Sequence, residues 1–240
     1  APGAVRGSVR KVVVTHSPAE VDATIVLGVN EEEYDPARHH VIAASICDAN
    51  ALAPVVKVLD RTFGISHGFL TTLHPWLSYQ NVVDGPSRSQ AFPGEVYHHY
   101  ALGRASLDSL IPKPTTAIEA TRRVLPKLSQ EFLCFSYRVP TAIVASGDLS
   151  VALSRPARVE DVIASLEEYE KGQAWRILHN SIEPLVSIDF CRSEYSATVD
   201  HRWTMVADGR LLKIVLWYDN EWGYGHRVVD LVRFIGASEK

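Results

Sequence analysis

Residues 40–54 read HVIAASICDANALAP, a short apolar run that leads through Cys47 into alanine-rich sequence. Such β-branched runs are typical of strands, and the apolar spacing over residues 52–63 predicts a helix that Gly64 ends. Cys47 is therefore expected at a strand-to-helix turn. Amide groups at a helix start stabilise a thiolate and can hold an oxyanion, so the turn is a candidate nucleophile site. If the helix already begins at Asp48, Pro54 should kink it.

A second apolar run, residues 68–73, ends at His74. An imidazole at the end of a neighbouring strand, beside a thiol at a strand-to-helix turn, suggests a nucleophile site. Cys47 and His74 together therefore predict a Cys/His nucleophile site whose thiol pKa lies below that of an ordinary cysteine. The alternative stays open that Cys47 is a small core residue and His74 a satisfied buried histidine.

The 240 residues carry 24 Lys and Arg against 28 Asp and Glu, a formal net charge of −4, and 46% are hydrophobic. This composition is ordinary for a globular chain with a sizeable core. No basic block indicates nucleic-acid binding, no apolar run reaches membrane-spanning length, and the first residues lack the apolar core of a signal peptide. We expect a cytoplasmic protein without nucleic-acid or membrane partners.

Three cysteines without a Cys-x-x-Cys pair favour neither a disulfide framework nor a zinc site, and they suit a reducing compartment. The two cysteines other than Cys47 lie in strand-like runs and are expected to be inert core residues. The adjacent pairs His39-His40 and His98-His99 diverge on helix and strand alike, so they are interpreted as surface or turn residues. The prediction is that the chain holds no metal.

The rest of the chain alternates short apolar runs with longer helical patterns. Strands are predicted at residues 12–14, 24–27, 41–44, 133–139, 143–153, 185–190, 197–199 and 211–218, and further helices at 116–125, 159–171 and 225–235. Residues 75–107 form a long irregular segment, which is usually functional or interface-forming. Because strands cluster in the second half with few crossovers, the predicted class is α+β, a mostly antiparallel mixed sheet with helices on one face.

Several blocks of this sequence occur in the order of one known family: GVN at 28–30, CDANALAP at 47–54, TTLH at 71–74, VDGPS at 83–87, LIP at 110–112, RVPT at 138–141 and WYDNEWGY at 217–224. With these blocks the chain resembles the C-terminal catalytic domain of phosphorylating glyceraldehyde-3-phosphate dehydrogenase, over nearly its whole length. The sister enzyme that acts on erythrose 4-phosphate shares most of the blocks.

The resemblance implies the chemistry of the two central residues. Cys47 would attack an aldehyde to give a thiohemiacetal, which hydride transfer to NAD converts into a thioester. His74 would be the general acid and base. The substrate would be a small aldehyde or phosphorylated aldehyde, and the pathway would be glycolysis.

The resemblance also implies roles for five binding residues. Arg138 matches the arginine for the substrate phosphate, since a guanidinium fork suits a phosphate, and Thr115 matches a hydroxyl donor at an anion site. Arg104 matches an arginine on the loop that borders this site. Asn220 matches the residue that holds the nicotinamide amide, and Tyr224 the aromatic beside that ring. Purely structural roles stay open as alternatives. Arg138 could bridge neighbouring strands, and Asn220 could stabilise a local turn.

Two departures from the family pattern change what is expected. No Gly-x-Gly-x-x-Gly occurs, so residues 1–46 are interpreted as remnant strands of the nucleotide-binding half and residues 47–240 as the catalytic and oligomerisation domain. The anion sites also differ, with Ile46 and Asp48 around the cysteine, and Leu77 and Tyr79 where two threonines are expected. A carboxylate at Asp48 would repel a phosphate, so either water is the acyl acceptor or the substrate carries no phosphate.

Three hypotheses follow. The first is an NAD-dependent aldehyde dehydrogenase domain that works with an NAD-binding partner domain. The second is a non-redox hydrolase that uses Cys47 and His74. The third is a catalytically inactive oligomerisation or scaffold module. In each case a homo-oligomer or tight complex is expected, because the apolar strand at residues 211–217 would leave a patch if unpaired.

Overall fold

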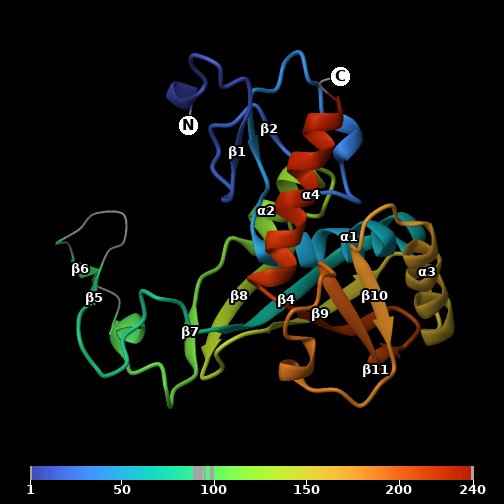
Figure 1. Cartoon of the computed structure of the whole chain (residues 1–240). Helices are drawn as coiled ribbons and strands as arrows, with labels where there is room; N and C mark the ends of the chain where they lie inside the picture. Colours follow the sequence, from blue (N-terminus) through green and yellow to red (C-terminus); the bar gives the residue numbers. More distant parts are fainter. Residues whose placement is uncertain (1, 89–93, 95, 98–99, 239–240) are drawn as a thin grey trace.

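The computed structural model describes residues 2–88, 94, 96–97 and 100–238. One pair of histidines discussed above, His98 and His99, lies outside the described residues. The described part holds a large sheet, a small sheet at the N-terminal end and a two-stranded ribbon formed by β5 (Ser87–Arg88) and β6 (Val96–Tyr97) (Figure 1). Its helices include none that is long and apolar enough to cross a lipid bilayer.

The large sheet has seven strands in the order β10-β11-β12-β9-β4-β8-β7. In chain order the strands are β4 (Ile65–Pro75), β7 (Ile111–Lys113), β8 (Phe132–Val139), β9 (Ala145–Leu153), β10 (Leu178–Ser181), β11 (Ala197–Ala207) and β12 (Leu211–Tyr218). Two neighbouring pairs, β10/β11 and β4/β8, are parallel, and the other four are antiparallel. The predicted α+β class with a mostly antiparallel mixed sheet is confirmed.

Helices cover one face of this sheet. α1 (Cys47–Phe63), α2 (Ala117–Val124) and α3 (Val159–Gly172) pack against it and against one another (Figure 1). Strand β4 shows the resulting alternation, since Leu70, Thr72 and His74 are buried under the helices. Phe69 and Leu73, which point the other way, are exposed. The alternation places His74 on the face that α1 covers.

The N-terminal segment forms a small all-parallel sheet of β1 (Val12–Val14), β2 (Ala23–Thr24) and β3 (Val41–Ala43), in the order β1-β3-β2. The last helix, α4 (Trp222–Ser238), packs on it through Leu231 and Ile235, which join Ile42 in one buried cluster (Figure 1). Strand β3 runs directly toward α1, so this small sheet sets where the helix start and Cys47 lie.

Four sequence-based element predictions differ from the structure. Helix α1 begins at Cys47 rather than at residue 52, so Pro54 lies inside it. Residues 185–190 are not a strand, and the short 3-10 helix Ser187–Phe190 occupies the end of that range. Strand β10 was not predicted, because LHNS, residues 178–181, is half polar. Helix α4 also starts three residues earlier than predicted, at Trp222.

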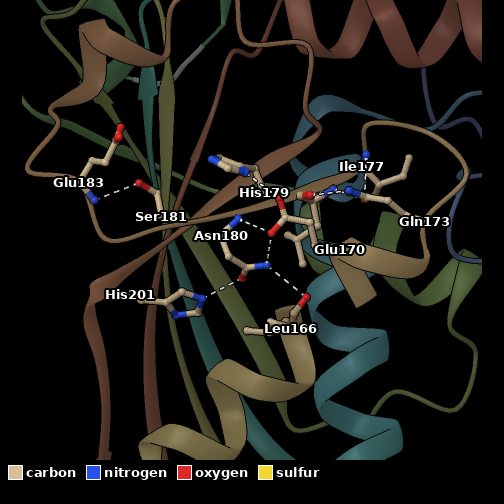
Figure 2. A network of polar contacts seen from close by, with 10 residues as sticks. Leu166, Glu170, Gln173, Ile177, His179, Asn180, Ser181, Glu183 and His201 are labelled. Carbon is tan, nitrogen blue, oxygen red and sulfur yellow. Dashed lines mark hydrogen bonds and ion pairs between the residues drawn. The ribbon is translucent and has the colours of Figure 1, made fainter. Parts of the chain in front are cut away.

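The polar residues of β10 are used in a network that fastens α3 to the edge of the sheet (Figure 2). The Asn180 amide donates to Leu166 O and to Glu170 Oε2, and Asn180 Oδ1 accepts a hydrogen bond of 2.8 Å from His201 Nε2. Glu170 also pairs with His179 Nδ1 at 2.7 Å. Burial raises the pKa of Glu170, but the hydrogen bonds from His179 and Asn180 outweigh it and leave the pKa below its ordinary value.

Candidate active site

Cys47 lies at the predicted strand-to-helix turn, separated from β3 by residues 44–46, and is itself the first residue of α1. The turn before it holds Ser45 in the left-handed region, at a φ of +59°, which is a strained conformation for a residue with a side chain. The Asn50 amide ties the turn to the helix by donating to Ala44 O at 2.9 Å and to Ile46 O at 3.0 Å. The thiol is thereby fixed at the amide end of the helix, where negative charge is favoured.

His74 reaches Cys47 from the end of β4. Its Nε2 lies 3.8 Å from Cys47 Sγ, and its Nδ1 lies 2.8 Å from Pro75 O. A carbonyl only accepts hydrogen bonds, so the neutral ring carries its proton on Nδ1 and leaves the Nε2 lone pair toward the sulfur. The structure therefore brings together the two residues that the sequence predicted as nucleophile and base.

The Asp48 carboxylate contacts the Cys47 thiol and accepts hydrogen bonds from two further side chains, Tyr218 and Thr115. Its Oδ1 accepts a hydrogen bond of 2.7 Å from the Tyr218 hydroxyl and lies 3.7 Å from Cys47 Sγ. Its Oδ2 accepts from Thr115 Oγ1 at 3.4 Å. Only 8% of the Asp48 surface is exposed. The hydroxyl that the resemblance assigned to an anion site is thus already paired with an anion of the chain itself.

The protonation state of the pair differs from the prediction. Burial raises the pKa of the Cys47 thiol well above its ordinary value, and the adjacent Asp48 carboxylate raises it further, which the charge of Arg138 only partly opposes. Burial lowers the pKa of His74. The prediction of a depressed thiol pKa is therefore wrong for the resting site, which holds a neutral thiol beside a neutral imidazole.

Arg138 stands next to His74 in the sheet, because the two residues are register partners in the parallel pair β4/β8. Its side chain is buried, its Nη2 donates to the Tyr79 hydroxyl at 3.2 Å, and its Nε has no hydrogen-bond partner. A buried guanidinium with an unused donor is suited to an anionic ligand. No carboxylate pairs with it among the described residues.

A second cation, Lys113, ends β7 one strand further along the sheet. Burial lowers its pKa, and the nearby charge of Arg138 lowers it further, whereas Asp48 raises it. The sequence indicated no role for Lys113 or for Tyr218. The inward alternation of residues 211–218 was the signal that could have found Tyr218, since it places the ring on the buried face.

Asn220 lies in the segment between β12 and α4, and Tyr224 lies in the first turn of α4. The Asn220 side chain is buried, and its Oδ1 has no hydrogen-bond partner. The Tyr224 hydroxyl donates to Ser45 O at 2.8 Å, which places it against the strained turn before Cys47. The unpartnered amide oxygen fits the amide group of a nicotinamide ring.

Arg104 is not brought to this cluster. It is largely exposed, and its Nε pairs with Asp84 Oδ1 at 3.0 Å within the irregular segment. Cys191, predicted to be an inert core residue, is exposed instead, while Cys134 is partly buried and donates to Thr115 O at 3.5 Å.

An α+β sheet domain that presents a helix-start cysteine to a strand-end histidine defines a class of thiol-dependent catalytic domains. Comparison with known proteins identifies the family within this class. Residues 46–220 match the family model described as "Glyceraldehyde 3-phosphate dehydrogenase, C-terminal domain". The chain belongs to this family.

Curated relatives agree with this family. The chain is 41% identical over 228 residues to the glyceraldehyde-3-phosphate dehydrogenase of Geobacillus stearothermophilus, covering 95% of this chain and 65% of that protein. It is 39% identical over 240 residues to glyceraldehyde-3-phosphate dehydrogenase 2 of Bacillus subtilis, with 100% and 68% covered. The cytosolic enzyme of Chlamydomonas reinhardtii is 38% identical over 225 residues, with 94% and 63% covered. The chain thus spans about two thirds of the length of these relatives.

Proposed function

We propose that this chain is the catalytic part of an NAD-dependent dehydrogenase that oxidises an aldehyde through a covalent bond to Cys47. The observation that carries the proposal is the approach of His74 Nε2, without its proton, to within 3.8 Å of Cys47 Sγ. The names of the curated relatives support an aldehyde of the glyceraldehyde 3-phosphate type and a place in glycolysis.

Each residue of the site has a proposed role in the reaction. Cys47 Sγ bonds to the aldehyde carbon while His74 Nε2 takes the thiol proton and passes it to the developing alkoxide, which gives a thiohemiacetal. His74 then accepts the hydroxyl proton as the carbon is oxidised to a thioester. NAD, when bound, supplies the hydride acceptor. Asn220 and Tyr224 are proposed to hold its nicotinamide end, and Arg138 to bind a substrate phosphate.

Residues 1–46 are proposed to belong to the nucleotide-binding half. Their all-parallel strand order supports this, because doubly wound nucleotide-binding sheets are parallel. The main NAD contacts would then come from an NAD-binding partner domain. A cytoplasmic location is proposed from the cytosolic relative and from three cysteines that all stay free.

A second candidate, a non-redox acyl hydrolase, is favoured by Asp48. Its carboxylate accepts the Thr115 hydrogen bond that an inorganic phosphate would need, and two negative charges a few Å apart repel by about 4 kcal/mol at an effective dielectric constant of 20. Water therefore suits this site better than phosphate as the acceptor of the acyl group. In both candidates Cys47 carries the acyl group.

The test is to trap that acyl group. The chain, combined with an NAD-binding partner domain, is incubated with glyceraldehyde 3-phosphate and NAD and then quenched in acid and digested. The mass of the peptide that holds Cys47 is measured by mass spectrometry. A thioester adduct that requires NAD is expected for the dehydrogenase, and an adduct from an aryl ester without NAD for the hydrolase. Cys191→Ser should retain the adduct and Cys47→Ser should lose it. An unmodified Cys47 under both conditions would refute both functions.

A further inference from the structure

Cys47, Asp48 and His74 form a cluster of three side chains that could bind one metal ion. A sulfur, a carboxylate oxygen and an imidazole nitrogen all lie within 4.8 Å of one another. Cys47 Sγ is 3.7 Å from Asp48 Oδ1 and 3.8 Å from His74 Nε2. A tetrahedral zinc ion with bonds of about 2.3 Å to sulfur and 2.0 Å to nitrogen or oxygen separates the sulfur from its other ligand atoms by roughly 3.5 Å, and nitrogen from oxygen by roughly 3.3 Å. Both distances from Cys47 Sγ are close to this spacing, and Asp48 and His74 complete it by moving closer together.

Hydrogen bonds with neighbouring groups fix the orientation of His74 and Asp48. Pro75 O accepts the Nδ1 proton of His74 and so fixes the tautomer whose Nε2 is free to bind a metal. The Tyr218 hydroxyl donates to Asp48 Oδ1 and Thr115 Oγ1 donates to Asp48 Oδ2, so both oxygens of the carboxylate are held in place. Hydrogen bonds of this kind are what orients the ligands of zinc centres. The main rearrangement needed to bind one ion is therefore a closer approach of Asp48 and His74.

The ligand atoms of Cys47, Asp48 and His74 indicate which metal ion this cluster would bind. A thiolate and an imidazole are preferred by Zn²⁺, whereas Mg²⁺ and Ca²⁺ require sites built from oxygens. The complex of Zn²⁺ with a thiolate and a carboxylate has no net charge, so the neighbouring cations Arg138 and Lys113 oppose it far less than they would oppose an uncompensated ion. Binding releases the Cys47 thiol proton to the buffer as the S–Zn bond forms.

We propose that Cys47, Asp48 and His74 form a zinc-binding site that switches the thiol off reversibly. The bound ion occupies the sulfur and the nitrogen that the reaction needs, so the metal competes with the aldehyde. This consequence rests on the proposed function, whereas zinc binding itself does not. It differs from the expectation, drawn from cysteine spacing alone, that the chain holds no metal.

The experiment is calorimetric titration of the chelator-stripped chain with zinc chloride. One equivalent of Zn²⁺ is expected to bind, and Mg²⁺ is expected not to. Cys47→Ser, Asp48→Asn and His74→Gln should each weaken the zinc affinity by more than about 100-fold, since even outer hydrogen-bond partners of a metal ligand contribute 10- to 100-fold. Cys191→Ser, which removes an exposed thiol elsewhere, should keep the affinity.

A second measurement uses the unmodified chain, so its result does not depend on whether the variants fold. Zn²⁺ should protect Cys47, but not Cys191, from iodoacetamide, and EDTA should restore the labelling of Cys47. An affinity unchanged by Asp48→Asn, or lost with Cys191→Ser, would overturn the proposed site. Zinc binding with no acyl adduct on Cys47 in the trapping test would leave this site standing and refute the proposed chemistry.

Discussion

Asp48 is the residue that most changes the chemistry expected of Cys47. Its carboxylate lies beside the sulfur, accepts from Tyr218 and Thr115, and is almost fully buried. A helix start favours a thiolate, but a full negative charge in contact with the sulfur outweighs the partial charge of the helix end. The resting thiol therefore stays protonated, and its ionisation has to be coupled to proton transfer to His74.

Replacing Asp48 by Asn should make Cys47 more reactive. Removing the charge lowers the thiol pKa, so the rate of iodoacetamide labelling at pH 7 should rise on the order of tenfold or more, with EDTA present. In the unmodified chain the labelling rate should still be rising at about pH 8.5, the ordinary pKa of a cysteine.

The matched control is Asp148→Asn, on the opposite face of the sheet, where Asp148 pairs with Lys213. This change should leave the labelling of Cys47 as it is. A labelling rate that Asp48→Asn does not increase would show that the carboxylate is not what holds the thiol neutral.

Tyr218 should matter for stability through the same carboxylate. Tyr218→Phe removes a buried hydrogen bond to a charged group, and the free energy of unfolding should fall by about 1–3 kcal/mol, measured by urea denaturation. Tyr224→Phe removes a hydrogen bond to the uncharged Ser45 O and should cost less, about 1 kcal/mol. An equal or larger loss in Tyr224→Phe would contradict this ranking.

At the scale of elements, α3 and β10 depend on buried polar contacts as well as on apolar packing. Glu170 accepts from His179 and from both the backbone and the amide of Asn180, while Asn180 also binds His201 on the next strand. These contacts explain why half-polar sequence forms a strand at the edge of the sheet. They also make this edge sensitive to acid.

Glu170 should give the chain part of its acid sensitivity. Its folded-state pKa lies below the unfolded value of 4.5, so its contribution to stability is complete above that pH and is lost as the pH falls through the folded pKa. Glu170→Gln should be less stable at pH 7 and should lose less stability between pH 5 and pH 3, by circular dichroism. Glu168→Gln, on the exposed face of α3, should follow the unmodified chain.

At the scale of the whole molecule, the sheet face opposite the helices is open. Large apolar residues are exposed there on neighbouring strands, with Phe69 60% and Leu133 55% exposed, and Phe135 and Leu73 beside them. The sequence analysis expected this patch on residues 211–217, but Leu212, Ile214 and Leu216 are buried and only Leu211 is fully on the surface. The apolar surface is thus centred on β4 and β8.

This face should mediate self-association. Phe69→Glu combined with Leu133→Glu should convert an oligomer into a monomer in light scattering at micromolar concentration, because paired charges are costly in an apolar interface. Val229→Glu, an exposed apolar position on α4, serves as the control and should leave the oligomer intact. A chain that is already monomeric would contradict the expected homo-oligomer and weaken the scaffold hypothesis.

The sequence by itself determined the fold class, the strand that ends at His74 and the strand-to-helix turn that holds Cys47, because strands and helices follow from neighbours along the chain. The family followed from sequence blocks that occur in the family's order, such as CDANALAP at 47–54. Only the tertiary structure decided where the Asp48 carboxylate lies and how Tyr218 and Thr115 hydrogen-bond to it. It also decided that Arg104 lies outside the site. Hydrogen bonds and desolvation depend on residues up to 170 positions apart, and these set the protonation of the thiol and the grouping of three metal ligands.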